Sequence, residues 1–180
     1  MILVAALATG GRDQLMVARW AATFGQSAQL LALAIASACL TAAAMAYIGA
    51  ELAAILPRRA AQMLVAFALA IAAAELVLPV RLAPAREPTR SLAALGIVLV
   101  ARQFGDAARF AVFALAAWAV WPVTAGLGGA VGGAAAVALG WGAGETALAK
   151  WRLPLLRRVL AAGLAVTALF IGLDARLAAA

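Results

Sequence analysis

The sequence contains no histidine, only one cysteine and few charged residues, and each shortage removes a class of function. Without histidine the commonest transition-metal ligand is missing. The single thiol of Cys39 excludes an internal disulfide and a thiolate metal cluster. A bound cation would therefore need oxygen ligands, which favour hard ions such as Ca²⁺, Mg²⁺ or Mn²⁺. The sequence also lacks a nucleophile–histidine pair and a phosphate-binding loop, so we do not expect an enzyme.

Apolar residues make up most of the chain. Hydrophobic residues occupy 68% of the 180 positions, charged residues only 12%, and the mean hydropathy is +1.07. A soluble domain has about 45–50% apolar and about 25% charged residues. The sequence therefore predicts an integral membrane protein in contact with the lipid bilayer. Its net charge of +7 comes mostly from residues that flank apolar segments, which indicates topology signals and headgroup contacts rather than nucleic-acid binding.

Six apolar segments are long enough to cross a bilayer, which needs about 20 residues per helix. We therefore expect an all-α bundle of six transmembrane helices. The expected helices cover residues 2–24, 28–50, 61–80, 91–120, 123–145 and 155–173. The stretch 81–90 contains two prolines and four charges, which predicts a loop that divides the chain.

The two halves of the chain resemble each other. Gly10 and Gly105 each lie among polar residues in the first helix of their half, and a Leu-Pro step with an arginine pair precedes the third helix of each half. Residues 1–80 and 91–180 are therefore predicted to be two copies of a three-helix unit. Because three is an odd number, the copies must have opposite orientations in the membrane. Transporters use such inverted repeats to build a site at the repeat interface.

Basic residues indicate the orientation, because cytoplasmic loops carry an excess of them. Eight follow the first, third and fifth helices, and three lie on the opposite side. The two groups are Arg19, Arg81, Arg86, Arg90, Lys150, Arg152, Arg157 and Arg158, against Arg58, Arg59 and Arg176. This count predicts a cytoplasmic central loop and outer termini, in a protein of the bacterial inner membrane.

Arg102, Asp106 and Arg109 interrupt the fourth apolar segment. Their i, i+4 and i+7 spacing would place them on one face of a continuous helix. Three charges in a membrane helix cost about 7–10 kcal/mol before any pairing, so such a face is expected to line a pathway or a helix contact. Two interpretations of Asp106 stay open: a structural ion pair with Arg102 or Arg109, and a direct role in transport.

Two short segments, one in each half, carry the remaining polar residues of these helices. The first is Thr9-Gly10-Gly11-Arg12-Asp13-Gln14 and the second is Arg102-Gln103-Phe104-Gly105-Asp106-Ala107. With the two-times-three topology, these segments resemble altered copies of the Glu-x-Gly-Asp-Lys/Arg-Thr/Ser motif of the Gdt family of small membrane cation transporters. The resemblance extends over nearly the whole chain. It implies a six-helix fold that exchanges Mn²⁺ or Ca²⁺ for protons, with no permanently bound cofactor.

The match to the motif is incomplete. Gly10, Arg12, Gly105 and Asp106 agree with it, whereas both glutamates are replaced and only one motif aspartate remains. The replacements are Ala8 and Gln103 for glutamate, Gly11 for aspartate, Asp13 and Ala108 for the hydroxyl residue, and Ala107 for the basic residue. We predict an ion pathway formed by Asp106, Gln103, Gly105, Arg102, Arg109, Gly10, Gly11, Arg12, Asp13 and Gln14, with Asp106 as the metal ligand.

Several local interpretations accompany this prediction. An ion pair between Arg12 and Asp106 is expected across the repeat interface, and Glu75 and Asp174 are expected to be solvated at helix ends. Residues Gly128, Gly132, Ala136, Gly140 and Gly144 recur every four positions, which predicts close helix packing. The alternatives to cation transport are a non-transporting scaffold or partner of an intact paralogue, and a transporter of an anionic or neutral solute. As partners besides the bilayer, we expect a second copy of the chain, in a homo-oligomer, or another membrane protein.

Overall fold

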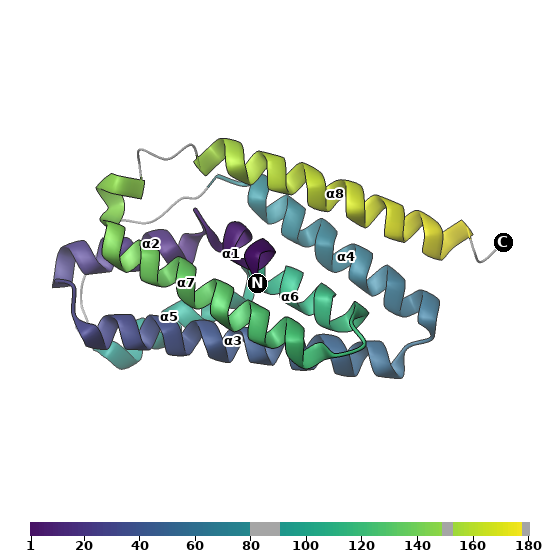
Figure 1. Ribbon diagram of the computed structural model, residues 1–180, viewed down its shortest axis with the longest axis horizontal. Helices are drawn as coiled ribbons and strands as arrows, with labels where there is room; N and C mark the ends of the chain where they lie inside the picture. The colour runs from purple at the N-terminus through teal and green to yellow at the C-terminus, as the bar shows by residue number, and fades with distance from the viewer. Residues whose placement is uncertain (80–90, 149–152, 178–180) are drawn as a thin grey trace.

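The computed structural model describes residues 1–79, 91–148 and 153–177, and every regular element in these ranges is an α-helix. The helices are α1 (Ile2–Ala8), α2 (Arg12–Phe24), α3 (Ala28–Ile55), α4 (Arg58–Val77), α5 (Leu92–Phe104), α6 (Ala107–Trp118), α7 (Pro122–Leu148) and α8 (Leu153–Leu177). They form an elongated bundle (Figure 1). The all-α prediction is confirmed for the described residues. The predicted loop at 81–90, together with Lys150 and Arg152, lies outside them.

Four of these helices, α3, α4, α7 and α8, are long and apolar enough to cross a membrane. Their bounds agree with the second, third, fifth and sixth predicted segments to within a few residues. Local signals explain where they begin. The Ser27 hydroxyl accepts a hydrogen bond from the backbone N–H of Leu30 and caps α3. Proline precedes α4 at Pro57 and opens α7 at Pro122, where its missing N–H costs nothing.

The first and fourth predicted segments are each divided into two shorter helices. Residues 9–11 separate α1 from α2, and Gly105 and Asp106 separate α5 from α6. The prediction of one continuous helix over 91–120 is therefore wrong. Gly105 ends α5 and Asp106 caps α6, so the pair stops one helix and starts the next.

The helices pack so that α6 lies between α3 and α4, α2 lies on α7, and α8 covers α4 (Figure 1). The interior consists mainly of alanine and small aliphatic residues. One buried cluster contains residues of α1, α3, α4, α6, α7 and α8, and a second joins α2, α3, α5 and α7. Such small side chains allow close approach of the helix backbones.

The small residues of α7 face the first interrupted helix, as predicted from their spacing. A methyl group on Gly132 would come within 2.8 Å of the Ala5 nitrogen, and one on Gly140 within 2.6 Å of the Gln14 carbonyl oxygen. Gly144 departs from this pattern, because it has a φ of +73° that interrupts α7 and nothing lies within 4 Å of its missing side chain. The stripe therefore holds α1 and α2 against α7, and it ends before Gly144.

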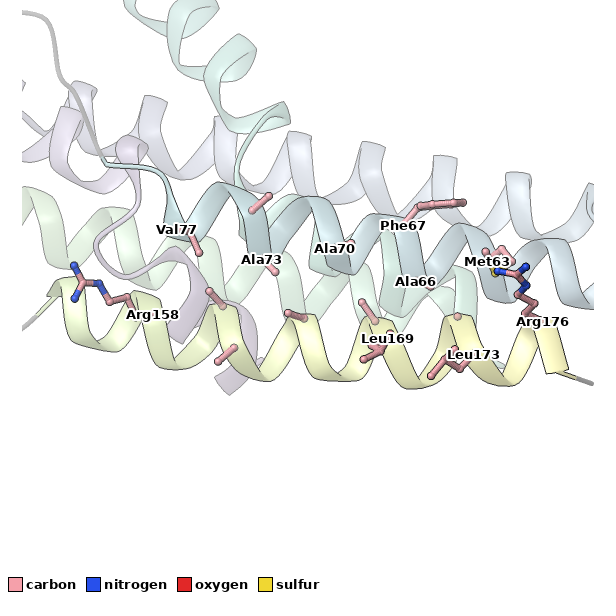
Figure 2. Close-up of a pocket in the computed structure, with 16 residues that line it drawn as sticks. Met63, Ala66, Phe67, Ala70, Ala73, Val77, Arg158, Leu169, Leu173 and Arg176 are labelled. Atoms are coloured by element: carbon pink, nitrogen blue, oxygen red, sulfur yellow. The ribbon is translucent and has the colours of Figure 1, made fainter.

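A groove of about 770 Å³ runs between α4 and α8 on the outside of the bundle (Figure 2). Half of its lining residues are alanine, and Arg158 and Arg176 lie at its opposite ends. These two arginines are about 27 Å apart along α8 at 1.5 Å per residue. That separation is close to the thickness of the hydrocarbon core, about 30 Å, so α8 presents the charge spacing expected of a membrane-spanning helix.

Candidate functional site

The polar residues of the chain gather where the two interrupted helices meet the rest of the bundle. Gly10 adopts a φ of +75° between α1 and α2, a conformation that glycine adopts without strain. Gly11 then caps α2 through its backbone, while Asp106 caps α6 with its side chain. The Gly-Gly and Gly-Asp steps thus occupy equivalent positions in the two interruptions, in the register that the motif comparison predicted.

The interruption of α5–α6 changes the location of the three charges of the fourth segment. Arg102 lies in the last turn of α5 and is exposed, whereas Asp106 and Arg109 are buried. The predicted common face of all three residues is therefore wrong, because it required a continuous helix. Gly105 is likewise exposed and Phe104 beside it is exposed too, so this step turns the chain rather than forming the inner wall of the site.

Two buried carboxylates approach each other beside Gly11. Asp13 is 1% exposed and Asp106 is 4% exposed. A side chain on Gly11 would begin 2.9 Å from Asp13 Oδ1 and 3.3 Å from Asp106 Oδ1, so the absence of a side chain leaves room for both. Arg12, the neighbour of Asp13, points elsewhere and is partly exposed, so only one of these two adjacent residues enters the interface.

Each carboxylate also holds the start of its own helix. Asp13 Oδ1 accepts a hydrogen bond from the Gln14 backbone N–H at 2.8 Å, and Asp106 Oδ2 accepts one from the Ala108 N–H at 3.2 Å. The positive ends of the two helix dipoles favour negative charge at these positions. The other oxygen of each pair, Asp13 Oδ2 and Asp106 Oδ1, is buried without a hydrogen-bond partner.

Arg109 supplies a positive charge next to the two carboxylates and is completely buried. Its Nε donates to the Thr41 hydroxyl on α3 at 2.7 Å, and that hydroxyl lies 3.0 Å from Gln103 Oε1. Its Nη1 and Nη2 lie against the backbone of Gly133 on α7 and have no hydrogen-bond partner. Gln103 Nε2 is also buried without a partner.

The ion pair expected between Asp106 and Arg102 or Arg109 is not formed. Among the described residues, no nitrogen of Arg109 comes within ion-pair distance of a carboxylate oxygen, and Arg102 is exposed. Asp106 therefore keeps an oxygen available. The positive charge of the Arg109 guanidinium interacts electrostatically with the Asp106 carboxylate without an ion-pair contact.

A second charged group lies on the other side of Gly10. Arg157 donates from Nη1 to the Gly10 carbonyl oxygen at 3.2 Å and from Nη2 to the Glu75 carbonyl oxygen at 3.0 Å. Arg157 Nη2 also lies 3.4 Å from each Glu75 carboxylate oxygen, and Arg12 Nε lies 3.6 Å from Glu75 Oε1. This group joins α8, α4 and the first interruption.

Three predictions are corrected by this second group. Arg12 pairs with Glu75 rather than Asp106, because the start of α2 lies next to the end of α4. Glu75 is buried, although its position near a helix end predicted solvation, whereas Asp174 is exposed as expected. Arg157 was counted with the cytoplasmic loops but is buried in α8. The sequence does contain a signal for Glu75 and Arg157, because an ionisable residue within an apolar membrane helix usually has a function.

Gln14 fixes the first interruption to α7, and Arg109, at the equivalent position after the second interruption, reaches α3. Gln14 Oε1 accepts the Gly10 N–H at 2.7 Å, and Nε2 donates to the Ala136 carbonyl oxygen on α7 at 2.9 Å. Gln14 follows Gly10 by four residues and reaches α7, while Arg109 follows Gly105 by four residues and reaches α3. The predicted site residues on the two motifs are thus brought together, except for Arg102, Gly105 and the partly exposed Arg12.

No protein family, curated protein or solved structure matches this chain. Within the described parts of the chain there is also no group of three or more Asp, Glu, His or Cys residues placed to hold a metal ion. What the protein does is therefore inferred from its own residues.

Proposed function

We propose that the protein is a secondary membrane transporter that carries a small cation through the site between its two interrupted helices. The observation that supports this most directly is the pair of buried carboxylates, Asp13 and Asp106, each with one oxygen that has no partner. Burying an unpartnered carboxylate oxygen costs free energy, so a protein keeps such a pair where a ligand compensates it. Interrupted helices are a common way of building such sites within membrane transporters.

The proposed architecture has six membrane crossings arranged as two inverted repeats. In this arrangement α1–α2 and α5–α6 each form one interrupted crossing, and α3, α4, α7 and α8 are the others. The equivalent places of Gly11 and Asp106, and of Gln14 and Arg109, support the repeat. We further propose that the central loop is cytoplasmic and that the protein resides in a bacterial inner membrane, as the distribution of basic residues indicates.

The chemistry of the site favours a cation over an anion. Oxygen-only donors suit hard cations, and carboxylates can also accept protons. An anionic cargo would bind at helix N-termini, but at α2 and α6 the carboxylates of Asp13 and Asp106 already occupy these positions. The resemblance to Gdt transporters implies Mn²⁺ or Ca²⁺ as cargo and protons as the exchanged ion.

The alternative proposal is a non-transporting membrane scaffold, alone or with an intact paralogue. One observation favours it: the charged network at the two interruptions contains three acidic and three basic residues, five of them buried, so it is balanced without a cargo. These residues are Asp13, Glu75, Asp106, Arg12, Arg109 and Arg157. A scaffold needs no cation flux and should copurify with another membrane protein.

Flux in proteoliposomes decides between the two proposals. Purified protein is reconstituted with a pH dye inside, and gradients of Mn²⁺, Ca²⁺, Na⁺ or K⁺ are applied. We expect cation-driven proton movement from the wild type and a loss of at least about tenfold in Asp106→Asn, because that change removes one of two anionic groups at the site. Asp174→Asn is the matched control, since Asp174 is an exposed acid on α8. No flux with any cation from folded wild-type protein would remove the transport proposal.

A further inference from the structure

The charges at the two interruptions fall into two groups of opposite net sign. The inner group contains Asp13, Asp106 and Arg109, and sums to one negative charge. The outer group contains Glu75, Arg12 and Arg157, and sums to one positive charge. The available carboxylate oxygens belong to the inner group.

From this arrangement we infer that the site accepts cargo with a single positive charge, a proton or an alkali cation, and that Arg109 excludes divalent cations. This inference rests on the cation site proposed above and replaces the divalent cargo that the resemblance to Gdt transporters implies with a singly charged one. One positive charge neutralises the inner group. A divalent ion would leave it positive, next to an outer group that is positive as well.

Arg109 cannot easily leave the site to make room for a second charge. Its Nε is bonded to Thr41 at 2.7 Å, and its guanidinium rests on Gly133, where an added methyl group would come within 2.9 Å of both terminal nitrogens. The side chain is 0% exposed, so it has no solvated position to which it could swing. Thr41 and Gly133 lie on the long helices α3 and α7, which hold the guanidinium from two sides.

In the outer group, Glu75 and Arg157 are held by hydrogen bonds, and the net charge is positive. Arg157 makes hydrogen bonds to the Gly10 and Glu75 carbonyl oxygens, and the Glu75 carboxylate lies between Arg157 and Arg12. Glu75 is therefore already compensated by two cations. Its carboxylate adds a negative field at Asp106, and the two arginines beside it offset that field.

The number of donors leads to the same conclusion. Ca²⁺ takes 6–8 oxygen ligands and Mg²⁺ requires a near-octahedral set, usually with more than one carboxylate. The inner group has two unpartnered carboxylate oxygens, and the polar hydrogens beside them, on Arg109 and Gln103, are donors that repel a cation. The attraction to a net single negative charge only doubles when the charge of the ion doubles, whereas the cost of dehydrating the ion rises about fourfold, with the square of its charge. An alkali ion is therefore cheaper to dehydrate at this site than a divalent ion, and a proton on the carboxylate pair needs no set of ligands.

Changing the net charge of the inner group tests the inference without any knowledge of the natural cargo. Gln103→Glu adds a negative charge with almost the same shape, and Arg109→Gln removes the positive one. If one of these variants does not fold, the other still provides the test. Gln29→Glu and Arg59→Gln make the same changes of charge at exposed positions and serve as controls.

Binding is measured as thermal stabilisation of detergent-solubilised protein, followed by tryptophan fluorescence, in NaCl, KCl, CaCl₂ or MnCl₂ at matched ionic strength and at several pH values. We expect the wild type to respond to pH or to an alkali ion but not selectively to Ca²⁺ or Mn²⁺. Stabilisation that follows pH at constant salt identifies the proton, and stabilisation that follows Na⁺ or K⁺ at constant pH identifies the alkali ion. Either inner-group variant should bind Ca²⁺ or Mn²⁺ at least about tenfold more tightly than the wild type, and the controls should not.

The same proteins are then reconstituted to separate binding from transport. Single-charge binding without flux supports the inference and removes the transport proposal. Selective wild-type binding of Mn²⁺ or Ca²⁺ overturns the inference and leaves transport standing. The inference is also overturned if the wild type binds no cation and neither inner-group variant gains a divalent ion.

Discussion

At the residue scale, each interruption contributes one carboxylate to the site, and the two carboxylates occupy different positions in the two motif segments. Asp106 is the cap of α6, whereas the equivalent Gly11 has no side chain to cap α2. Asp13, two residues later, bonds the Gln14 N–H and places its Oδ1 next to Gly11. The loss of an acidic side chain at one position is thereby offset by an acid two positions away. A position-by-position comparison counts Gly11 and Asp13 as two separate departures from the motif, although together they keep one carboxylate at the site.

Of the two adjacent arginines of α8, Arg157 should contribute more to stability than Arg158. Arg157→Met leaves the buried Glu75 carboxylate with only the partly exposed Arg12, at 3.6 Å, and removes the bonds to two carbonyl oxygens. Breaking a buried ion pair in this way costs about 3–5 kcal/mol. We expect a correspondingly lower midpoint of thermal unfolding in detergent, measured by tryptophan fluorescence.

Arg158→Met provides the matched control for that measurement. Arg158 is exposed at the end of the α4–α8 groove, so its loss should change the unfolding free energy by about 0.5 kcal/mol or less (Figure 2). Equal effects of the two substitutions would show that Arg157 does not hold the first interruption. Partial recovery in the double variant Arg157→Met/Glu75→Gln would separate the unpaired charge from the lost carbonyl contacts.

At the scale of the elements, the two interruptions use glycine for different reasons. Gly10 has a φ of +75°, and an added methyl group would meet Leu153 side-chain atoms at 3.3 Å. Gly105 has a φ of −92°, with only one atom near its missing side chain, at 3.7 Å. We expect Gly10→Ala to destabilise the protein by about 1–2 kcal/mol through backbone strain, and Gly105→Ala to have little effect. Thermal unfolding of both variants checks this, and similar losses would contradict the asymmetry.

The sequence allowed the long helices to be predicted, but it did not allow their partners to be predicted. Hydropathy located α3, α4, α7 and α8 within a few residues, because an apolar run of that length has few other folds. Hydropathy is averaged over many residues and therefore does not reveal the interruptions, although Gly105-Asp106 carries both a helix stop signal and a helix start signal. The predicted place of Arg102 in the site depends on a continuous helix, because it follows from the spacing of Arg102 and Asp106 alone.

The pairing of charges depended on tertiary structure and was out of reach of the sequence. Glu75 and Arg157 come together because α8 packs along α4, and the local sequence of neither helix contains that information. Arg12 joined Glu75 rather than Asp106 for the same reason. Asp13 and Asp106 of the inner group nevertheless lie in the two motif segments, and Arg109 follows the second segment by two residues. Thr41 and Gly133, which hold Arg109, are ordinary helix residues in any sequence comparison.

At the scale of the whole molecule, the open question is how often the chain crosses the membrane. Neither α5 nor α6, with 13 and 12 residues, is long enough to cross alone, since 13 residues span about 20 Å. The two could form one interrupted crossing, or they could enter and leave on the same side. Only the first arrangement gives two inverted three-helix units.

Single-cysteine labelling on either side of α5–α6 distinguishes these arrangements. In a Cys39→Ser background, Ala85→Cys lies in the stretch before α5, outside the described residues, and Val120→Cys lies between α6 and α7 at a position that is 89% exposed. A membrane-impermeant maleimide is added to right-side-out and inverted membrane vesicles. The excess of basic residues near the central loop predicts labelling of Ala85→Cys only in inverted vesicles and of Val120→Cys only in right-side-out vesicles. The Cys39→Ser protein without a new cysteine should stay unlabelled in both.

Reversed labelling would keep the crossing and overturn the orientation, whereas labelling of both positions from one side would make α5–α6 re-entrant and remove the inverted repeat. In that case Asp106 would be reached from one side of the membrane only, and alternating access at this site would no longer follow from the fold.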